Sequence, residues 1–221
     1  MLLAMLAPLA AQPAGAQGFK FSQPDPTEQA EKEAQQARDD KIWEQLATPC
    51  RAQLKDKKIM VVIGERASNG IISAQQQNYG QHFDAINRRL RALGLRTFTP
   101  EEIRRQIAQA EIDAYFRNDP EAALSASKRL GASFVLRGLI SSQAGRNPMI
   151  PVNQVSIDMD FTLTGSNGRV ISDAQASNSS YAGANVSRMA LTLVNEKADE
   201  VVAKLYSDYC RAGGYPPARK P

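Results

Sequence analysis

The chain of 221 residues has few of the side chains from which metal sites and catalytic centres are built. It contains one histidine, two cysteines and one tryptophan, and the cysteines do not form a CxxC pair. The nucleotide-binding pattern GxxxxGK[ST], the zinc pattern HExxH and the nucleophile pattern GxSxG are also missing. We therefore expect no cofactor, no metal ion and no catalytic residues, and we interpret the chain as a protein that is not an enzyme.

Charge of one sign is not in large excess either. The formal net charge is +4, and acidic and basic residues alternate along the segments predicted to be helical. Proteins that bind nucleic acid through its phosphates commonly concentrate their basic residues in a patch or stripe. The sequence has no such block, so we expect no nucleic-acid partner.

The amino terminus has no charged side chain and predicts the compartment. Residues 1–16 are rich in Leu and Ala and are too few to span a bilayer, which takes roughly 20 residues. The run ends in small residues that signal peptidase accepts, so we expect a signal peptide cleaved after Ala16. The mature protein would then be a soluble, secreted protein of the bacterial periplasm without a stable membrane anchor. The alternative is a hydrophobic tail on a cytosolic protein.

The two cysteines fit an oxidising compartment. Cys50 and Cys210 stand near the two ends of the predicted folded domain, and we expect a disulfide bond between them. In the chain-entropy model a loop of this length stabilises the fold by about 4–5 kcal/mol. The alternative is two separate buried thiols.

Hydrophobic patterning predicts an α/β (α+β) fold. Ile59–Ile63 is a continuous apolar run, typical of a strand covered on both faces. Ala126–Ser142 predicts the end of a helix, a stop at Gly131 and then a buried strand. Val155–Leu163 alternates apolar and polar residues, as a strand with one wet face does. Asn167-Gly168 predicts a hairpin turn with positive φ at both positions.

Helical patterning completes the predicted order, β-α-β-α-β-β-β-α, in a mixed sheet with helices packed on it. The predicted helices are Tyr79–Leu93, a helix capped by Thr99 that runs to about Phe116, and Asn185–Cys210. The domain plan is a signal peptide (1–16), a flexible leader (17–26), a polar N-terminal helix (27–48), one α/β domain (49–212) and a flexible tail (213–221). The N-terminal helix is either a solvated helix or a helix that lies against a partner.

Three groups of residues are candidates for a site. The loop from Glu65 to Gly70 follows a buried strand, where α/β proteins commonly bind ligands, so Glu65, Arg66, Ser68 and Asn69 are possible partner-binding residues. A long polar connection is the alternative. His82 and the pair Asp158 and Asp160 have chemistry-bearing side chains. We interpret His82 as a partly exposed surface residue and the aspartates as the solvent face of the sheet.

The pattern around Ala126–Ile140, with Leu-Gly-Ala before an apolar strand, a long alternating strand and a return strand after Gly168-Arg169-Val170, resembles an α/β domain of envelope proteins. These are the curli secretion subunit (CsgG-like), the lipoprotein activator of penicillin-binding proteins (LpoB-like) and the TolB amino-terminal domain. The resemblance covers about residues 57–210. It implies an accessory or scaffold role in cell-envelope or surface-structure assembly. No cysteine follows the cleavage point for lipid attachment, and no pair of long amphipathic hairpins is present to build a pore.

Two functions from different classes follow. The first is a non-catalytic periplasmic accessory protein that binds another envelope protein, or further copies of itself, through the sheet edge, the Glu65–Gly70 loop or the N-terminal helix. The alternative is a periplasmic small-anion-binding protein or hydrolase that uses the Glu65–Gly70 loop, with Arg66 holding the anion.

Overall fold

The computed structural model describes residues 26–67, 69–74, 80–117, 119–149, 152–182 and 185–216. The predicted signal peptide, its cleavage after Ala16 and most of the leader lie outside these residues. The chain divides into two compact units, residues 1–36 and 37–221. Of the first unit the structure describes the amino-terminal half of helix α1 (Pro26–Leu46), where every side chain is exposed. Side-chain pairs four residues apart, such as the ion pair of Lys32 with Glu28 at 2.6 Å, stabilise this part of the helix.

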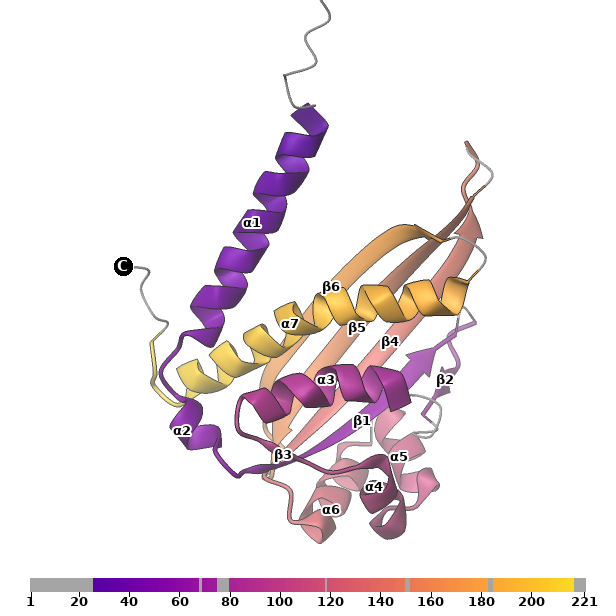
Figure 1. Cartoon of the computed structure of the whole chain (residues 1–221). Helices are drawn as coiled ribbons and strands as arrows, with labels where there is room; N and C mark the ends of the chain where they lie inside the picture. The colour runs from indigo at the N-terminus through magenta and orange to yellow at the C-terminus, as the bar shows by residue number, and fades with distance from the viewer. Residues whose placement is uncertain are drawn as a thin grey trace, which may run out of the picture. The chain divides into compact units, whose positions relative to one another are not determined.

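The second unit is built on a mixed sheet, as the sequence predicts (Figure 1). Its order is β2-β1-β4-β5-β6, and β3 pairs with the start of β1. Strands β1 and β4 are parallel, whereas β4–β5 and β5–β6 are long antiparallel pairs. The strands are β1 (Lys58–Arg66), β2 (Ile72–Ser73), β3 (Arg96–Thr97), β4 (Phe134–Arg146), β5 (Asn153–Gly165) and β6 (Val170–Ala182).

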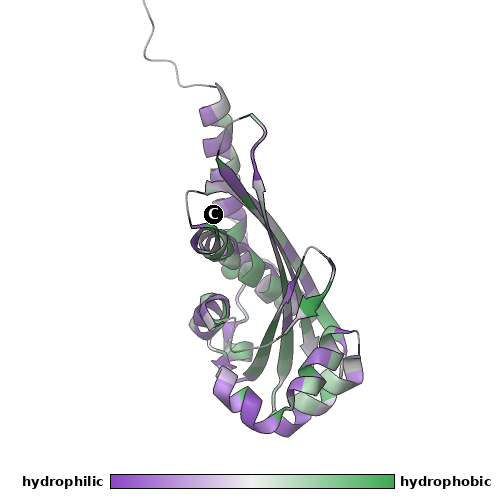
Figure 2. Ribbon diagram, turned by 90° about the vertical axis from the view of Figure 1, so that its right-hand side faces the viewer, coloured by the Kyte–Doolittle hydropathy of each residue, from purple (hydrophilic) through white to green (hydrophobic). Residues whose placement is uncertain are grey.

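Helices cover the two faces of the sheet unequally. Helices α3 and α7 pack on one face, and α4, α5 and α6 lie at the lower end of the other (Figure 2). The upper part of that second face has no helix over it within the described residues, and we call it the open face. The bounds are α2 (Arg51–Leu54), α3 (Gly80–Ala92), α4 (Pro100–Gln106), α5 (Gln109–Phe116), α6 (Pro120–Leu130) and α7 (Val186–Ala212). No described helix is long and apolar enough to cross a membrane.

The core lies where β1, β4 and β5 run side by side. Leu136 in β4 is fully buried, with Val61 of β1 and Leu163 of β5 as its partners in register. Leu136 and Leu163 line the same side of the sheet as Leu205 of α7. The continuous apolar run of β1 is buried on both faces, as its sequence predicts.

Capping residues set the ends of the helices. Thr99 accepts a hydrogen bond from the Glu102 N–H at 3.2 Å, and Asn185 accepts one from the Arg188 N–H at 2.9 Å. Gly131 ends α6 with φ at 64°, the left-handed conformation that a glycine stop provides. These three boundaries agree with the sequence prediction.

Two local predictions are wrong. The helix from Thr99 to Phe116 is two helices, because Ile107 is extended and the Glu111 side chain accepts a hydrogen bond from the Ala108 N–H to start α5. The hairpin turn has positive φ at Gly168 only, and a register shift between Leu163 and Thr164 takes up the extra residue.

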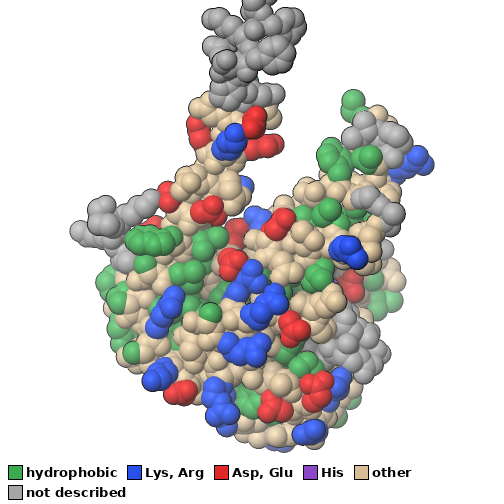
Figure 3. Space-filling view, in the orientation of Figure 1, with side chains coloured by type: hydrophobic (Ala, Val, Ile, Leu, Met, Phe, Trp, Pro, Cys, Tyr) green, Lys and Arg blue, Asp and Glu red, His purple; other side chains and the backbone are tan. Residues whose placement is uncertain are grey.

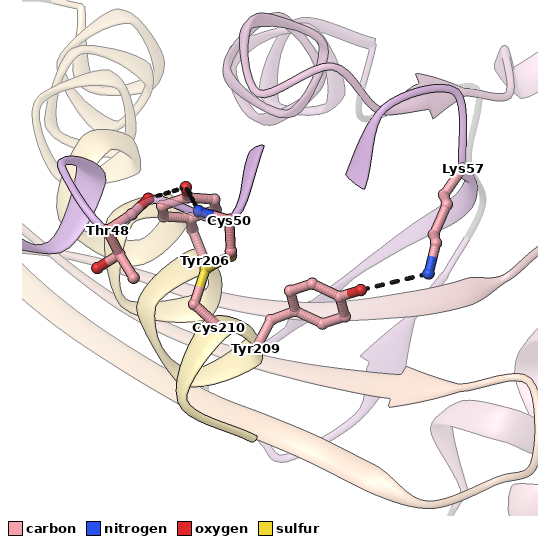
Figure 4. The surroundings of a disulfide bond; sticks show 6 residues. All are labelled: Thr48, Cys50, Lys57, Tyr206, Tyr209 and Cys210. Atoms are coloured by element: carbon pink, nitrogen blue, oxygen red, sulfur yellow. Dashed lines mark hydrogen bonds between the residues drawn. A yellow bond between two sulfur atoms is a disulfide. The ribbon is translucent and has the colours of Figure 1, made fainter. Parts of the chain in front are cut away.

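The predicted disulfide is present. Cys50 and Cys210, with Cα atoms 5.8 Å apart, join the chain ahead of α2 to the end of α7 (Figure 4). The buried Tyr206 hydroxyl donates to the Thr48 carbonyl and accepts from the Cys50 N–H at 3.3 Å. The bridge therefore lies in a hydrogen-bonded, buried corner of the second unit.

A methyl group added to Gly138 tests the core packing. Its Cβ would lie 2.4 Å from the Phe161 ring, its partner across the sheet, so Gly138→Ala should lower the free energy of unfolding by about 1–3 kcal/mol. Gly145→Ala in the same strand meets nothing within 4 Å and is the matched control. Urea unfolding of both variants measures the difference, and equal stabilities would contradict this packing.

Candidate functional site

The predicted loop at Glu65–Gly70 begins later than expected. Strand β1 continues through Arg66, because Glu65 pairs with Ser73 and Arg66 pairs with Ile72 of β2. Neighbouring strand residues point to opposite faces of a sheet. Glu65 and Arg66 are therefore separated by the sheet, and the structure does not bring them together in one site.

The remainder of the predicted loop is a short turn between β1 and β2. The Ala67 N–H donates to the Ile71 carbonyl at 2.9 Å, and Asn69 Oδ1 accepts from the Ile71 N–H at 3.0 Å. Gly70 has φ at 81°. Ser68 lies outside the described residues. Asn69 thus has a structural role in shaping this turn, and partner binding by these residues stays a prediction.

Glu65 lines a cleft of about 340 Å³ between α3, α7 and the sheet. Its carboxylate accepts a hydrogen bond from Ser142 Oγ at 3.1 Å, and His82 lines the same cleft. Burial lowers the pKa of His82, and the Glu65 carboxylate raises it by less. His82 is thus half-buried and more often neutral than a free histidine. The serine hydroxyl bonds to the carboxylate, which is not the arrangement of a serine nucleophile activated by histidine.

The lowered pKa of His82 makes stability depend on pH. In the unfolded chain His82 has its ordinary pKa of 6.5, so below that value the unfolded state binds the proton more tightly. Stability that is present above pH 6.5 is therefore lost as the pH falls toward the lower pKa that His82 has in the folded protein. We expect His82→Gln to lose less stability than wild type between about pH 7.5 and about pH 5. Unfolding curves at several pH values measure this, and parallel pH profiles would contradict the assignment.

Arg66 points to the open face, where it meets a row of polar side chains. Register places Arg66 beside Ser141, Ser141 beside Asp158, and Asp158 beside Ser177. Together with Asp160 they line a hollow of about 720 Å³. In β5 and β6 every second residue faces this side of the sheet, and the residues at these positions in the hollow are polar.

Asp158 and Asp160 form the wet face of β5, as the alternation predicts. No side chain within the described ranges donates a hydrogen bond or forms an ion pair with either carboxylate. Asp173 of β6 is exposed on the same face and accepts a hydrogen bond from Thr162 Oγ1 at 2.7 Å. The part of the open face next to β6 therefore has three carboxylates.

Strand β6 has one free edge along its whole length. It pairs with β5 on one side, and no described strand pairs with it on the other. The Ser179 N–H donates to Asn178 Oδ1 of the same strand at 3.0 Å, which shows that this amide points away from β5. Because amide directions alternate along an antiparallel strand, those of Ser177 and Tyr181 point outward too.

The sequence of β6 does little to protect this edge. Natural sheet edges are usually short, or they have lysine, proline or a bulge that blocks another strand. The 13 residues of β6 include no lysine and no proline. The only register shift in its pairing with β5 lies at the start of the strand, opposite Leu163 and Thr164. Tyr181, near the end of the strand, is 55% exposed. By contrast, β2 and β3 have two residues each.

Helix α7 lies directly over β6 on the covered face. Ser172 Oγ donates to Asp208 Oδ2 at 2.6 Å, and Asn178 Nδ2 donates to Glu196 Oε2 at 2.8 Å. Burial raises the pKa of Asp208, but hydrogen bonds from Lys204 and Ser172 outweigh it and hold the pKa below its ordinary value. These contacts fix β6 from one side and leave its edge and its open face accessible.

Basic side chains gather over α3 on the face that Figure 3 shows, with acidic side chains among them. Arg89 donates to both carboxylate oxygens of Asp199 in α7, at 2.7 and 2.8 Å, and Arg88 donates to Asn195 at 3.4 Å. These arginines connect two helices, so their role is structural. Among the described residues no three His, Cys, Asp or Glu side chains are grouped so that they could hold a metal ion.

No protein-family model matches this chain, and no curated protein does. Solved structures to which it is similar include the lipoprotein GNA1162 from Neisseria meningitidis, with 15% identity and a TM-score of 0.46 over 66% of this chain and 97% of that one. A PelC dodecamer from Paraburkholderia phytofirmans has 19% identity and a TM-score of 0.40, over 69% and 88%. The LpoB C-terminal domain from Salmonella enterica has 15% identity and a TM-score of 0.35, over 59% of this chain and 93% of that one.

An LpoB domain is among the solved structures to which this chain is similar, and LpoB-like proteins are among those that the sequence resembles. The CsgG-like and TolB parts stay predictions. All three TM-scores are below 0.5.

Proposed function

We propose that this chain is a non-catalytic accessory or scaffold protein of the bacterial cell envelope, and that it binds another protein through the free edge of β6. The observation that carries the proposal is this long unpaired edge, with outward amides at Ser177, Ser179 and Tyr181. An exposed edge of this kind accepts an extended segment of another protein as an added strand, through main-chain hydrogen bonds.

The disulfide and the predicted signal peptide support the compartment. Cys50 and Cys210 are bonded, and structural disulfides persist in oxidising compartments such as the periplasm. The position of the bridge supports a scaffold role as well. It fixes the end of α7, the helix that holds β6 through Ser172 and Asn178, so the binding edge rests on a rigid support.

Photo-crosslinking in intact cells tests this function. A photoreactive residue in place of Ser179 should capture one discrete partner, because position 179 faces open space at the edge. The same residue in place of Lys128, which is exposed on α6 near the turn where β6 begins and therefore away from position 179, is the matched control. Capture at 179 but not at 128 is the expected result. Equal capture at both positions, or capture at 128 alone, would contradict the proposal.

A further inference from the structure

We infer that the segment accepted by β6 is an extended basic peptide, with Lys or Arg at alternate positions that face the open side of the sheet. This inference rests on the proposed function and names the chemistry of its partner. Two independent features of β6 carry it: the outward direction of alternate backbone amides and the charges that border its edge.

The outward amides of β6 favour an extended partner. The hollow on the open face includes Gln175 and Ser177 of β6 in its lining, and also Lys197 and Glu200 of α7. Because α7 lies on the other side of β6, the hollow extends round the free edge of the strand. A strand added at this edge would lie about 4.8 Å from β6 and would bond to its outward amides.

The register dictates where the charges of that strand would lie. Ser177 stands between Asp158 and the edge, and Gln175 stands between Asp160 and the edge. An added strand lies about 10 Å from β5, two strand spacings away, which the long stem of Lys or Arg can span over these uncharged side chains. Asp173, on β6 itself, would be a direct cross-strand neighbour.

The balance of charge at the edge is negative. On the open face Arg66 lies on the far side of Asp158 from the edge, and Arg137 stacks on the Tyr115 ring at the lower end of the sheet. On the α7 side, Lys197 is paired with Glu200 at 2.9 Å. Asp158, Asp160 and Asp173 are the charged residues of β5 and β6, and all three face the open side of the sheet, so basic side chains complement this edge.

A second copy of the chain fits this edge poorly. Antiparallel pairing of β6 with β6 of another copy would place both α7 helices on the same face, each held over its own β6 by Asp208 and Glu196. It would also bring Asp158, Asp160 and Asp173 of both copies to the same open face, on either side of the joined edges, where like charges repel. A basic extended peptide adds no carboxylates to this face.

Synthetic peptides test the inference on the full-length mature protein. The probe has about eight residues with Lys at every second position and Thr and Val between them. Its matched control has Glu in place of each Lys. Fluorescence anisotropy should show saturable binding of the Lys peptide and none of the Glu peptide. Binding of the Lys peptide should weaken about fivefold in the Asp158→Asn/Asp160→Asn double variant at low salt, and the salt dependence should become shallower.

Two further variants separate strand addition from general charge attraction. Ser177→Pro removes one outward amide while leaving the ladder to β5 intact, and should weaken binding with little change in melting temperature. Ser177→Ala should bind as wild type does. Equal binding of both peptides, unchanged affinity in the aspartate variant, or a concentration-dependent dimer that the peptide does not dissociate would overturn the inference. If crosslinks form at position 179 while the Lys peptide fails to bind, the proposed function stands and the basic partner does not.

Discussion

Removal of the disulfide in a Cys50→Ser/Cys210→Ser variant is expected to lower the free energy of unfolding by about 4–5 kcal/mol. The two cysteines are 160 residues apart in sequence, so the bridge restricts a very large loop in the unfolded chain. A domain of this size has a total stability of about 5–15 kcal/mol, and the variant would keep only part of it. Urea unfolding of the oxidised protein, the reduced protein and the double variant measures the loss.

The folded structure should survive this change. Tyr206 still bonds to Thr48 and to the backbone of residue 50, so the ends of the second unit stay together in the native state. The reduced wild-type protein should therefore match the double variant, with an unchanged circular dichroism spectrum at low urea. A loss under about 1 kcal/mol would show that the unfolded chain is not restricted by the bridge.

Leu136→Ala should have the second large effect. Leu136 is completely buried in the central strand β4, with strands on both sides. Removing a buried leucine side chain loses its transfer free energy and leaves a cavity, at about 2–5 kcal/mol. The volume-conserving Leu136→Met is the control and should lose less than about 1.5 kcal/mol. Thermal and urea unfolding measure both variants.

Partner capture by the Leu136 variants should fall with the fraction of protein that is folded. Leu136→Ala should reduce crosslinking at position 179 only to the extent that it reduces the folded fraction, because Leu136 does not lie at the β6 edge. Normal stability of Leu136→Ala would contradict its place at the centre of the core.

Patterns that act over short distances were sufficient to predict much of the fold. The alternation of Val155–Leu163 gave both a strand and its wet face, on which Asp158 and Asp160 indeed lie. Gly131 and Asn185 stop and start helices through their own backbone and side chain, so their roles are visible in the sequence.

Features that depend on distant pairing were not predictable in this way. Polar Glu65 and Arg66 look like the start of a loop, but pairing with the two residues of β2 and with β4 keeps them in a strand and on opposite faces. One local feature was also missed: Ile107 continues the helical spacing of Ile103, and this spacing hides the break that the Ala108–Glu111 cap makes. Which strand lies at the edge depends on the parallel pairing of β1 with β4, which no local pattern encodes.

Hydrogen exchange at the β6 edge tests the central claim most directly. In the free protein the amides of Ser177 and Tyr181 should exchange faster than those of their neighbours Ala176 and Asn178, which point toward β5. In the complex with the partner that crosslinking at position 179 identifies, the amides of Ser177 and Tyr181 should become protected while those of their neighbours change little. Protection of the outward amides in the free protein, or their continued fast exchange in the complex, would contradict the claim that a partner strand adds to β6.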